Sequence, residues 1–441
     1  MKHTSPLIEQ ALNPADYFTL AIDEALRLEN MPGNLCGFGL ELDKQPDVSE
    51  LCTRILEFMQ QFPEVTASLQ QQGRRFFWRQ RPEPQQLFYQ HHCSSIESET
   101  FFFQTTISQI INHHAPRESL APIEFHLLTG PNRHALLLRW HHPLCDARGA
   151  ELILKYLCTE SLEQRALFDQ PNTPSLVQAQ LAKYSWWRKL RFFWQAYRYI
   201  RRLDHYRSIQ HRQSLDAPKR LHALTFRLTE TQTQQVAEHS RRLTGLTGTS
   251  LYYIGCLMRA LHKLEPDAPG EAYLAPYAFN LRKQKALTPL LGNHLGTLFA
   301  QAPKALLDNR EQLFAHLKEQ YAQTLKQQLD QAFFPTMWAA SFLPLVKHIK
   351  ELRASYKDGS ERSSFWFSDI GQLDSVERNF FGADITGVFH TCQVTSPPGL
   401  GLLMCKYRGQ LTLNYNFVEP LFNETWIKQL HERMSHELLG Q

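Results

Sequence analysis

Hydrophobic and polar residues alternate along the first 170 positions in patterns that predict helices and strands in turn. The stretch VSELCTRILEFMQQFPEV places Leu51, Ile55, Phe58 and Met59 at three- and four-residue spacing, which predicts an amphipathic helix that ends before Pro63. Before it, PADYFTLAIDEALRLENM is typical of a helix and LCGFGLEL of a strand. The chain therefore begins with mixed helices and strands.

Two apolar runs in PIEFHLLTGPNRHALLLRWHH are separated by Thr-Gly-Pro-Asn, which predicts a hairpin. The second run ends in His141 and His142, and the stretch AELILKYL that follows returns to helical spacing. We therefore expect the histidine pair at a junction between a strand and a helix, with Asp146 four residues after the second histidine.

The pattern changes in the middle of the chain. The stretch from Lys183 to Arg202 carries seven basic residues and no acidic one, which favours a connection between two domains. Beyond it, HALTFRLTETQTQQVAEHSRR predicts a strand and a helix, TGTSLYYIGCLMRALHKL a buried helix opened by a Thr or Ser cap, and 304–355 a long helical region. The end of the chain predicts a hairpin that turns at Arg408-Gly409 and a final helix that starts at Asn423. We therefore expect an α/β architecture twice over: an N-terminal lobe (1–170), a basic aromatic linker (171–220) and a C-terminal lobe (221–441).

Composition narrows the function. The 441 residues, 43% of them hydrophobic, exceed the usual size of one core, and the net charge of +4 is too small to indicate a nucleic-acid partner. The first residues lack the apolar segment of a secretory signal, and no window approaches ~20 consecutive apolar residues, so we expect a cytoplasmic protein. The eight cysteines form no CxxC pair, which disfavours a zinc site and a disulfide framework and fits reduced thiols.

Three His-His pairs are candidates for chemistry: His91-His92, His113-His114 and His141-His142. Neither of the first two follows a clear strand or has a supporting acid close by, so we expect no chemistry from them. The third follows a rigid strand, and an acid closes its turn, as a catalytic group requires. A plainer interpretation stays open on spacing alone, in which Asp146 only caps the next helix and the histidines only end the strand.

The stretch HHPLCD is similar to the HHxxxDG signature of the CoA-dependent acyltransferase superfamily, which includes condensation domains and wax-ester synthases. The segments NPADYFTLAIDE, GFGLELD and FPEVTASL, then YAFNLRKQ with LGNHLGTLF, and FWFSDIGQLD resemble further blocks of the wax-ester synthase branch in the expected order. The resemblance implies two chloramphenicol-acetyltransferase-like lobes that form a V around a central tunnel. The chain departs from the signature in one position, because Ala147 stands where glycine is expected and Gly149 follows two positions later. The DFGWG motif of the plant acyltransferase branch is absent from the sequence.

The resemblance also implies a mechanism. His142 would act as the general base that takes a proton from the attacking group, an imidazole with pKa near ambient pH being well suited to this, and strand alternation would point His141 to the other side as a structural residue. Asp146 would pair with Arg282 and hold the catalytic loop, and Ser368 is a candidate hydroxyl donor to the oxyanion. No cofactor or metal would be bound, since acyl-CoA or a phosphopantetheinyl acyl-carrier protein is the co-substrate.

The expected activity is transfer of an acyl group from such a thioester to the hydroxyl of a small molecule or lipid. Two alternatives stay open: an amide-forming condensation enzyme, and a binding or scaffold protein on the same fold without catalysis. Cys145 raises a rival mechanism with a covalent acyl-enzyme, although a lone cysteine in an apolar turn more often packs than reacts.

The basic aromatic linker allows three interpretations. A helical wheel gathers most of its large apolar residues on one side (Trp186, Trp187, Leu190, Phe193, Trp194, Tyr197 and Ile200) and four arginines on the other (Arg188, Arg191, Arg198 and Arg202). Such a helix over 183–202 fits peripheral contact with an anionic membrane, packing on the body of the protein, or docking of an acidic carrier protein.

Overall fold

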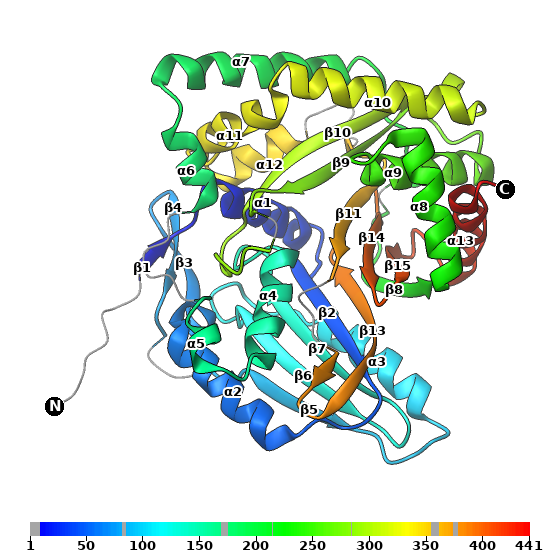
Figure 1. Ribbon diagram of the computed structural model, residues 1–441. Helices are drawn as coiled ribbons and strands as arrows, with labels where there is room; N and C mark the ends of the chain where they lie inside the picture. Colours follow the sequence, from blue (N-terminus) through cyan, green and yellow to red (C-terminus); the bar gives the residue numbers. More distant parts are fainter. Residues whose placement is uncertain are drawn as a thin grey trace.

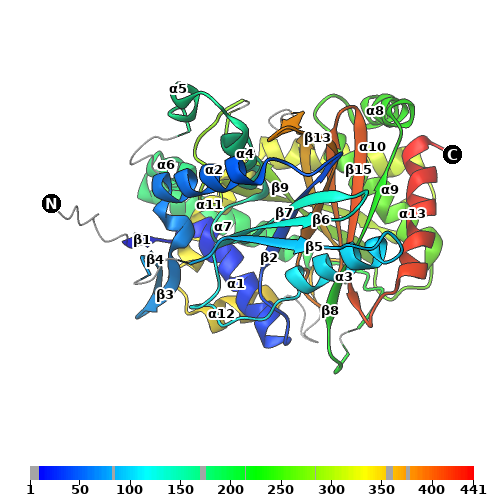
Figure 2. The same cartoon turned by 90° about the horizontal axis from the view of Figure 1, so that it is seen from below.

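The computed structural model describes residues 9–81, 85–168, 175–213, 215–283, 285–353, 361–373 and 378–441. Two α/β lobes lie against each other (Figure 1). One contains the large sheet in the lower part of the view, and the other contains the strands and helices above it and to its right. Figure 2 shows the same arrangement from below, with the long strands of the large sheet across the middle.

The N-terminal half of the chain supplies most elements of the first lobe. Its strands are β1 (Glu9–Ala11), β2 (Leu35–Leu42), β3 (Ser68–Gln72), β4 (Arg75–Arg79), β5 (Phe88–His92), β6 (Ile123–Thr129) and β7 (His134–His141). Its helices are α1 (Pro14–Leu28), α2 (Val48–Gln61), η1 (Pro63–Thr66), α3 (Glu99–Ile111), α4 (Ala147–Cys158) and α5 (Leu162–Arg165).

The rest of the chain builds the second lobe and also adds two strands, β12 and β13, to the large sheet of the first. Its helices are α6 (Leu176–Ala182), α7 (Trp186–Leu203), α8 (Glu230–Thr244), α9 (Thr249–Leu264), η2 (Lys304–Leu306), α10 (Arg310–Lys326), α11 (Leu329–Ala340), α12 (Leu345–Arg353) and α13 (Glu424–Leu439). Its strands are β8 (Arg220–Arg227), β9 (Ala272–Asn280), β10 (Leu295–Pro303), β11 (Trp366–Gln372), β12 (Asn379–Phe380), β13 (Ala383–Cys392), β14 (Leu400–Tyr407) and β15 (Gln410–Glu419).

The large sheet has six strands in the order β12-β13-β2-β7-β6-β5. Two of them, β12 and β13, come from the C-terminal half of the chain, and β13 pairs antiparallel with β2 from Ile385↔Leu42 to Cys392↔Cys36. A second sheet has the order β11-β14-β15-β8, and β9 pairs with β10 beside it. The predicted lobe boundaries at 170 and 220 stay predictions. They do not include the two C-terminal strands, β12 and β13, that join the sheet of the N-terminal half.

Local sequence explains where the helices near the lobe interface begin. Asn13 caps α1 by accepting from the backbone N–H groups of Ala15 and Asp16, and the Asp16 carboxylate accepts from the Asn13 N–H in return. Pro14 occupies the first helical position, where its missing N–H costs nothing. These contacts fix the start of α1 at the middle of the molecule, between the large sheet and the upper helices (Figure 1).

Two sequence-based expectations about the elements were wrong. The helix α9 has Gly248 as its N-cap, with no side-chain cap, because Thr249 already lies within the helix. His91 and His92 end the strand β5, because that strand pairs parallel with the buried β6. The helical region expected around 304–355 is present and consists of η2, α10, α11 and α12, and Gln328 adopts a left-handed conformation where α11 begins.

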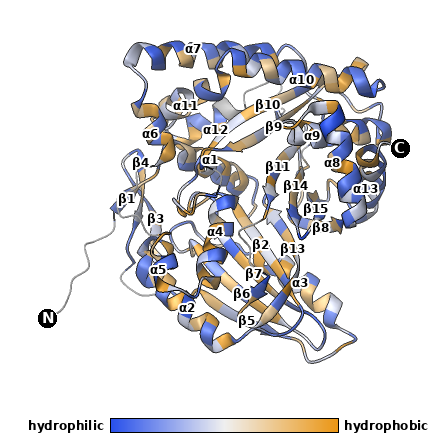
Figure 3. Cartoon of the chain, in the orientation of Figure 1, coloured by the Kyte–Doolittle hydropathy of each residue, from blue (hydrophilic) through white to orange (hydrophobic). Residues whose placement is uncertain are grey.

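Hydrophobic residues of both lobes gather in the interior strands and on the inner faces of the helices (Figure 3). The face of the large sheet that carries Phe38 and Trp140 packs with α4 in one cluster, and the opposite face joins α3 to the core of the second lobe. Among the described helices, none is both long and apolar enough to cross a membrane.

Candidate active site

His142 lies directly after β7, at the point where the two lobes meet. Its backbone N–H donates to the Asn34 carbonyl at 2.9 Å, and its own carbonyl accepts from the Asn293 side-chain amide at 2.9 Å. The first partner follows α1 in the N-terminal half, whereas the second lies just before β10 in the C-terminal half. The backbone of His142 is therefore held from both halves of the chain.

The two adjacent histidines point in different directions. The His141 ring is buried, and its Nε2 lies 3.0 Å from Asp23 Oδ1 on α1. Asp23 also accepts from Arg27 and Arg117, each at 2.9 Å, and burial, which alone would raise its pKa, is outweighed by these cationic neighbours and His141, so the pKa is lowered. His141 is thus fixed to α1 by a buried charge network, and it is not available to a substrate.

Asp146 and Arg282 form a buried ion pair between the two halves of the chain. The Arg282 Nη1 lies 2.9 and 2.8 Å from the two carboxylate oxygens, and both side chains are almost completely buried. Asp146 also caps α4 by accepting from the Gly149 N–H at 2.8 Å, and it accepts from the His294 N–H at 2.8 Å. The plain cap and the ion pair, weighed as alternatives from the sequence, are therefore both present.

The tight backbone approach lies at Gly149, not at the position that Ala147 occupies. A Cβ on Gly149 would lie 2.3 Å from the Leu290 carbonyl oxygen, a backbone atom that cannot easily move. Ala147 is partly exposed at the start of α4. The chain thus has a glycine where the loop before β10 crosses α4. Alanine at position 147, where the family signature has glycine, does not prevent the close approach of Gly149 to the Leu290 carbonyl.

The surroundings of His142 favour the neutral imidazole. Burial lowers the pKa of His142 from its ordinary value, although its own backbone carbonyl and the charge of Asp146 act in the opposite direction. Its Nδ1 is buried and makes no hydrogen bond to another described residue. The pKa of Asp146 is lowered: burial alone would raise it, but the Arg282 guanidinium outweighs that effect. At neutral pH the site therefore combines a neutral imidazole with a carboxylate whose charge Arg282 balances.

Asp16 and Asn293 support the His142 loop, although neither was predicted as a site residue from the sequence. Asp16 Oδ1 accepts from the Asn293 backbone N–H at 2.6 Å and from its side chain at 3.0 Å, and the same side chain holds the His142 carbonyl. Burial raises the pKa of Asp16 to about 7, against the lowering effect of the Asn293 donors. Asp16 is therefore a positioning residue for the His142 loop, and the capping pattern Asn-Pro-x-Asp was the signal that could have drawn attention to it.

His390 is a third residue that the sequence did not indicate. It lies on the exchanged strand β13 opposite Phe38, and its ring stacks on Trp140 with centroids 5.9 Å apart. It is 3% exposed, and neither ring nitrogen has a hydrogen-bond partner among the described residues. Burial lowers its pKa to about 3, and His142 is close enough to contribute to that lowering. A neutral imidazole without a hydrogen-bond partner among the described residues therefore stacks on Trp140, two residues before His142, and no sequence pattern brings positions 390 and 142 together.

Ser368 and Cys145 occupy different environments. Ser368 lies on β11 opposite Leu403, which pairs with Asn414 on β15, and residues paired in this way share one face of a sheet. The Asn414 side-chain oxygen accepts from the backbone N–H of His390 at 3.1 Å, so the face of the sheet that carries Ser368 and Asn414 is directed toward β13. Cys145 is fully buried in the turn, and burial raises the pKa of its thiol well above the ordinary value.

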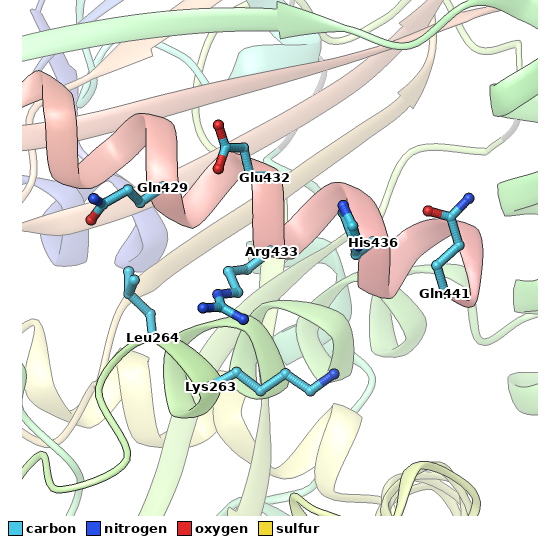
Figure 4. A pocket seen from close by; sticks show the side chains of 7 residues that line it. All are labelled: Lys263, Leu264, Gln429, Glu432, Arg433, His436 and Gln441. Atoms are coloured by element: carbon cyan, nitrogen blue, oxygen red, sulfur yellow. The ribbon is translucent and has the colours of Figure 1, made fainter.

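One further cavity lies away from the predicted site residues. A cavity of about 510 Å³ lies between the end of α9 and α13, where mainly polar side chains surround it and none of the predicted site residues takes part (Figure 4). Within the described ranges, no group of three or more His, Cys, Asp and Glu side chains is arranged to hold a metal ion.

Comparison with known proteins shows similarity in structure rather than in sequence. No family model matches the chain, and no curated protein matches its sequence. Among solved structures, trichothecene 15-O-acetyltransferase from Fusarium sporotrichioides matches with a TM-score of 0.73 at 11% identity, over 98% of this chain and 95% of that one. The first condensation domain of the calcium-dependent antibiotic synthetase matches with a TM-score of 0.70 at 13% identity, over 98% and 96%. The starter condensation domain of rhizomide synthetase, in complex with C8-CoA and Leu-SNAC, matches with a TM-score of 0.68 at 10% identity, over 98% and 94%.

At these identities the likeness shows the fold alone. The chain has the two-lobed, chloramphenicol-acetyltransferase-like α/β fold of the condensation domains, and that prediction is confirmed. The central tunnel and the roles of the individual residues stay predictions.

Proposed function

We propose that this protein is an acyltransferase that moves an acyl group from a thioester to a hydroxyl group, with His142 as the general base. One observation carries the proposal: the neutral imidazole of His142 lies at the junction of the lobes, close in sequence to the buried ion pair of Asp146 and Arg282. The backbone of His142 is hydrogen-bonded to Asn34 and Asn293. Such preorganisation is what a base requires in order to act without rearrangement during the reaction. The fold shared with acetyltransferase and condensation domains supports acyl transfer over other base-catalysed reactions.

The proposed step conserves atoms and charge. The acceptor hydroxyl oxygen forms a bond to the thioester carbonyl carbon while its proton passes to His142. We assign this transfer to Nε2, because Nδ1 is buried against the protein. The tetrahedral intermediate then collapses, the C–S bond breaks, and His142 returns the proton to the leaving thiolate. A base of this kind supplies about 10²–10⁴-fold of the rate.

The negative charge that develops on the carbonyl oxygen needs a donor. We assign His390 to this role, because its buried ring carries an N–H without a partner among the described residues and stacks on Trp140, two residues before His142. The low pKa keeps the His390 ring neutral. A neutral imidazole has one N–H that can donate a hydrogen bond, and it carries no extra proton that could pass to His142. Ser368, on the facing sheet, stays a second candidate for the same role.

The donor in this proposal is acyl-CoA or an acyl-carrier protein, held in a passage between the lobes, and the protein needs no bound cofactor. The starter condensation domain with C8-CoA supports a thioester of this kind on the same fold. An amine acceptor, which would give an amide, uses the same base and remains the second candidate, since the other solved matches include peptide-synthetase condensation domains.

Release of free thiol from a panel of acyl thioesters, with alcohol and amine acceptors, tests the proposal. We expect turnover that His142→Ala reduces by about 10²-fold or more and that Cys145→Ala largely keeps. The reverse order would replace direct attack by a covalent acyl-cysteine. Equal rates for the wild type and His142→Ala with every donor would favour a binding protein on this fold.

A further inference from the structure

The helix α7 has two apolar faces, and only one of them is buried. Its inner face packs on α11 and β10 through four side chains that follow helical spacing: Phe192, Ala196, Tyr199 and Leu203. Its outer face exposes five large side chains: Trp186 (63%), Trp187 (77%), Leu190 (40%), Trp194 (51%) and Tyr197 (48%). The helix runs along the outer edge of the second lobe (Figure 1). Packing on the body therefore explains one side of α7 and leaves the aromatic side unexplained.

The charge of the helix has one sign. Its 18 residues include six basic side chains and no acidic one. Arg191 and Arg198 are exposed, and neither forms an ion pair with a carboxylate among the described residues. Arg201 lies 4.0 Å from Asp204, at the end of the helix. The exposed aromatic face is therefore flanked by Arg191 and Arg198, whose positive charge no carboxylate among the described residues neutralises.

The aromatic surface continues beyond α7. The Trp186 ring contacts Trp338 edge-on with centroids 6.2 Å apart, and Trp338 contacts Phe342 at 5.1 Å. Phe342 is 52% exposed. Lys189 lies over the Trp338 ring at 5.4 Å. Single exposed apolar residues are ordinary on proteins, but a continuous aromatic patch rimmed by cations marks an interaction surface.

We propose that the outer face of α7 is a docking surface for an anionic lipid bilayer. Tryptophan and tyrosine favour the headgroup region of a membrane, because their rings are apolar at one end and polar at the other. Arginines beside them attract anionic headgroups, and an amphipathic helix that lies in the interface plane uses this combination. A helix of 18 residues is about 27 Å long, so it can lie along a bilayer surface over its whole length.

A bilayer fits this face better than an acidic carrier protein does. Three of the exposed side chains are tryptophans on a helix at the outer edge of the lobe (Figure 1), and tryptophan is the residue that membrane–water interfaces favour most clearly together with tyrosine, which this face also exposes. The proposal does not depend on the acyl transfer proposed above, because α7 shares no residue with the His142 site.

Flotation with two kinds of vesicle tests the proposal: phosphatidylcholine with phosphatidylglycerol, and phosphatidylcholine alone. We expect the full-length protein to float with the anionic vesicles and to stay largely unbound with the neutral ones. Trp187→Ser combined with Trp194→Ser should weaken binding by tenfold or more. Arg191→Gln combined with Arg198→Gln should weaken it by about 25-fold, at roughly fivefold for each charge, and added salt should imitate this loss.

The matched control is Leu246→Ser, which removes an equally exposed apolar side chain (82%) from a loop after α8 and should not change binding. Unchanged unfolding temperatures would show that the surface variants remain folded. Equal binding to both kinds of vesicle, or no binding, would overturn the proposal. It would also fail if the tryptophan variants abolished binding to an acyl-carrier protein, or dissolved a dimer, without any change in flotation.

Discussion

Loss of Arg282 should destabilise the whole protein, because it leaves a carboxylate buried without its cation. Both side chains are almost completely inaccessible, at 1% and 0%, and Arg282 Nη1 contacts both oxygens of Asp146. Breaking such a pair from one side costs about 3–5 kcal/mol. Arg282→Met should fall at the low end, because the N–H groups of Gly149 and His294 still donate to the carboxylate.

Asp146→Ala should cost more than Arg282→Met. It leaves a guanidinium without its carboxylate and also removes the cap of α4, which adds about 1 kcal/mol. With an entropy of unfolding of about 2.1 cal/mol/K per residue, 441 residues give about 0.9 kcal/mol/K, so losses of about 3–6 kcal/mol lower the unfolding temperature by about 3–6 °C. Thermal unfolding followed by tryptophan fluorescence measures the shift.

The double variant gives the sharper test. Asp146→Ala with Arg282→Met removes both charges, so its loss should be smaller than the sum of the single losses by about 0.5–3 kcal/mol. The exposed pair of Glu424 and Lys428, 3.2 Å apart on α13, provides the matched control, and its disruption should give no measurable shift. Additive losses at 146 and 282, or shifts no larger than those of the α13 pair, would refute the reasoning.

Three further predictions concern the site. The acid limb of kcat/KM should have its midpoint below pH 6.5, because burial lowers the pKa of His142 and the neutral ring is the active form. A midpoint above pH 6.5 would contradict this, provided that the limb disappears from the pH profile of a still-active variant that lacks the His142 ring. His390→Phe should reduce kcat by about 10²-fold while raising the unfolding temperature, since it removes a donor to the reaction and two unpartnered buried nitrogens; loss of both activity and stability would indicate packing alone. Gly149→Ala should destabilise the protein by about 1–3 kcal/mol, since its methyl group would collide with the Leu290 carbonyl, whereas Ala147→Gly should cost no more than a helix glycine, about 1 kcal/mol; denaturation midpoints separate the two.

The sequence predicted the local parts of the site better than their assembly. A continuous apolar run after a turn signal located the strand before His142, and helical apolar spacing located the helix after it, because both signals come from neighbouring residues. Only the family resemblance linked Asp146 to Arg282, since 136 positions separate them and no periodicity acts over that distance. The structure brings the two together.

Other features had no sequence signal of their own. His390 reaches the site because β13 pairs with β2, more than 300 positions earlier in the chain, and a strand pattern does not name its partner. The inner face of α7 was missed for a different reason. The sequence of α7 has large apolar residues on every side of the helix. The helical wheel therefore emphasised the larger tryptophans, which point outward, over Phe192 and Ala196, which pack on the body of the protein.

Because β13 pairs with β2 in the sheet of the N-terminal half, the chain does not divide into two pieces that can be expressed separately. A fragment that ends near position 170 would leave one side of β2 bare over seven ladder partners, from Cys36 to Leu42. A row of free amides and carbonyls of that length invites a second copy to add its own strand, so such a fragment would self-associate. Anyone who wishes to separate the halves would have to graft 383–392 back onto the first, or accept aggregates.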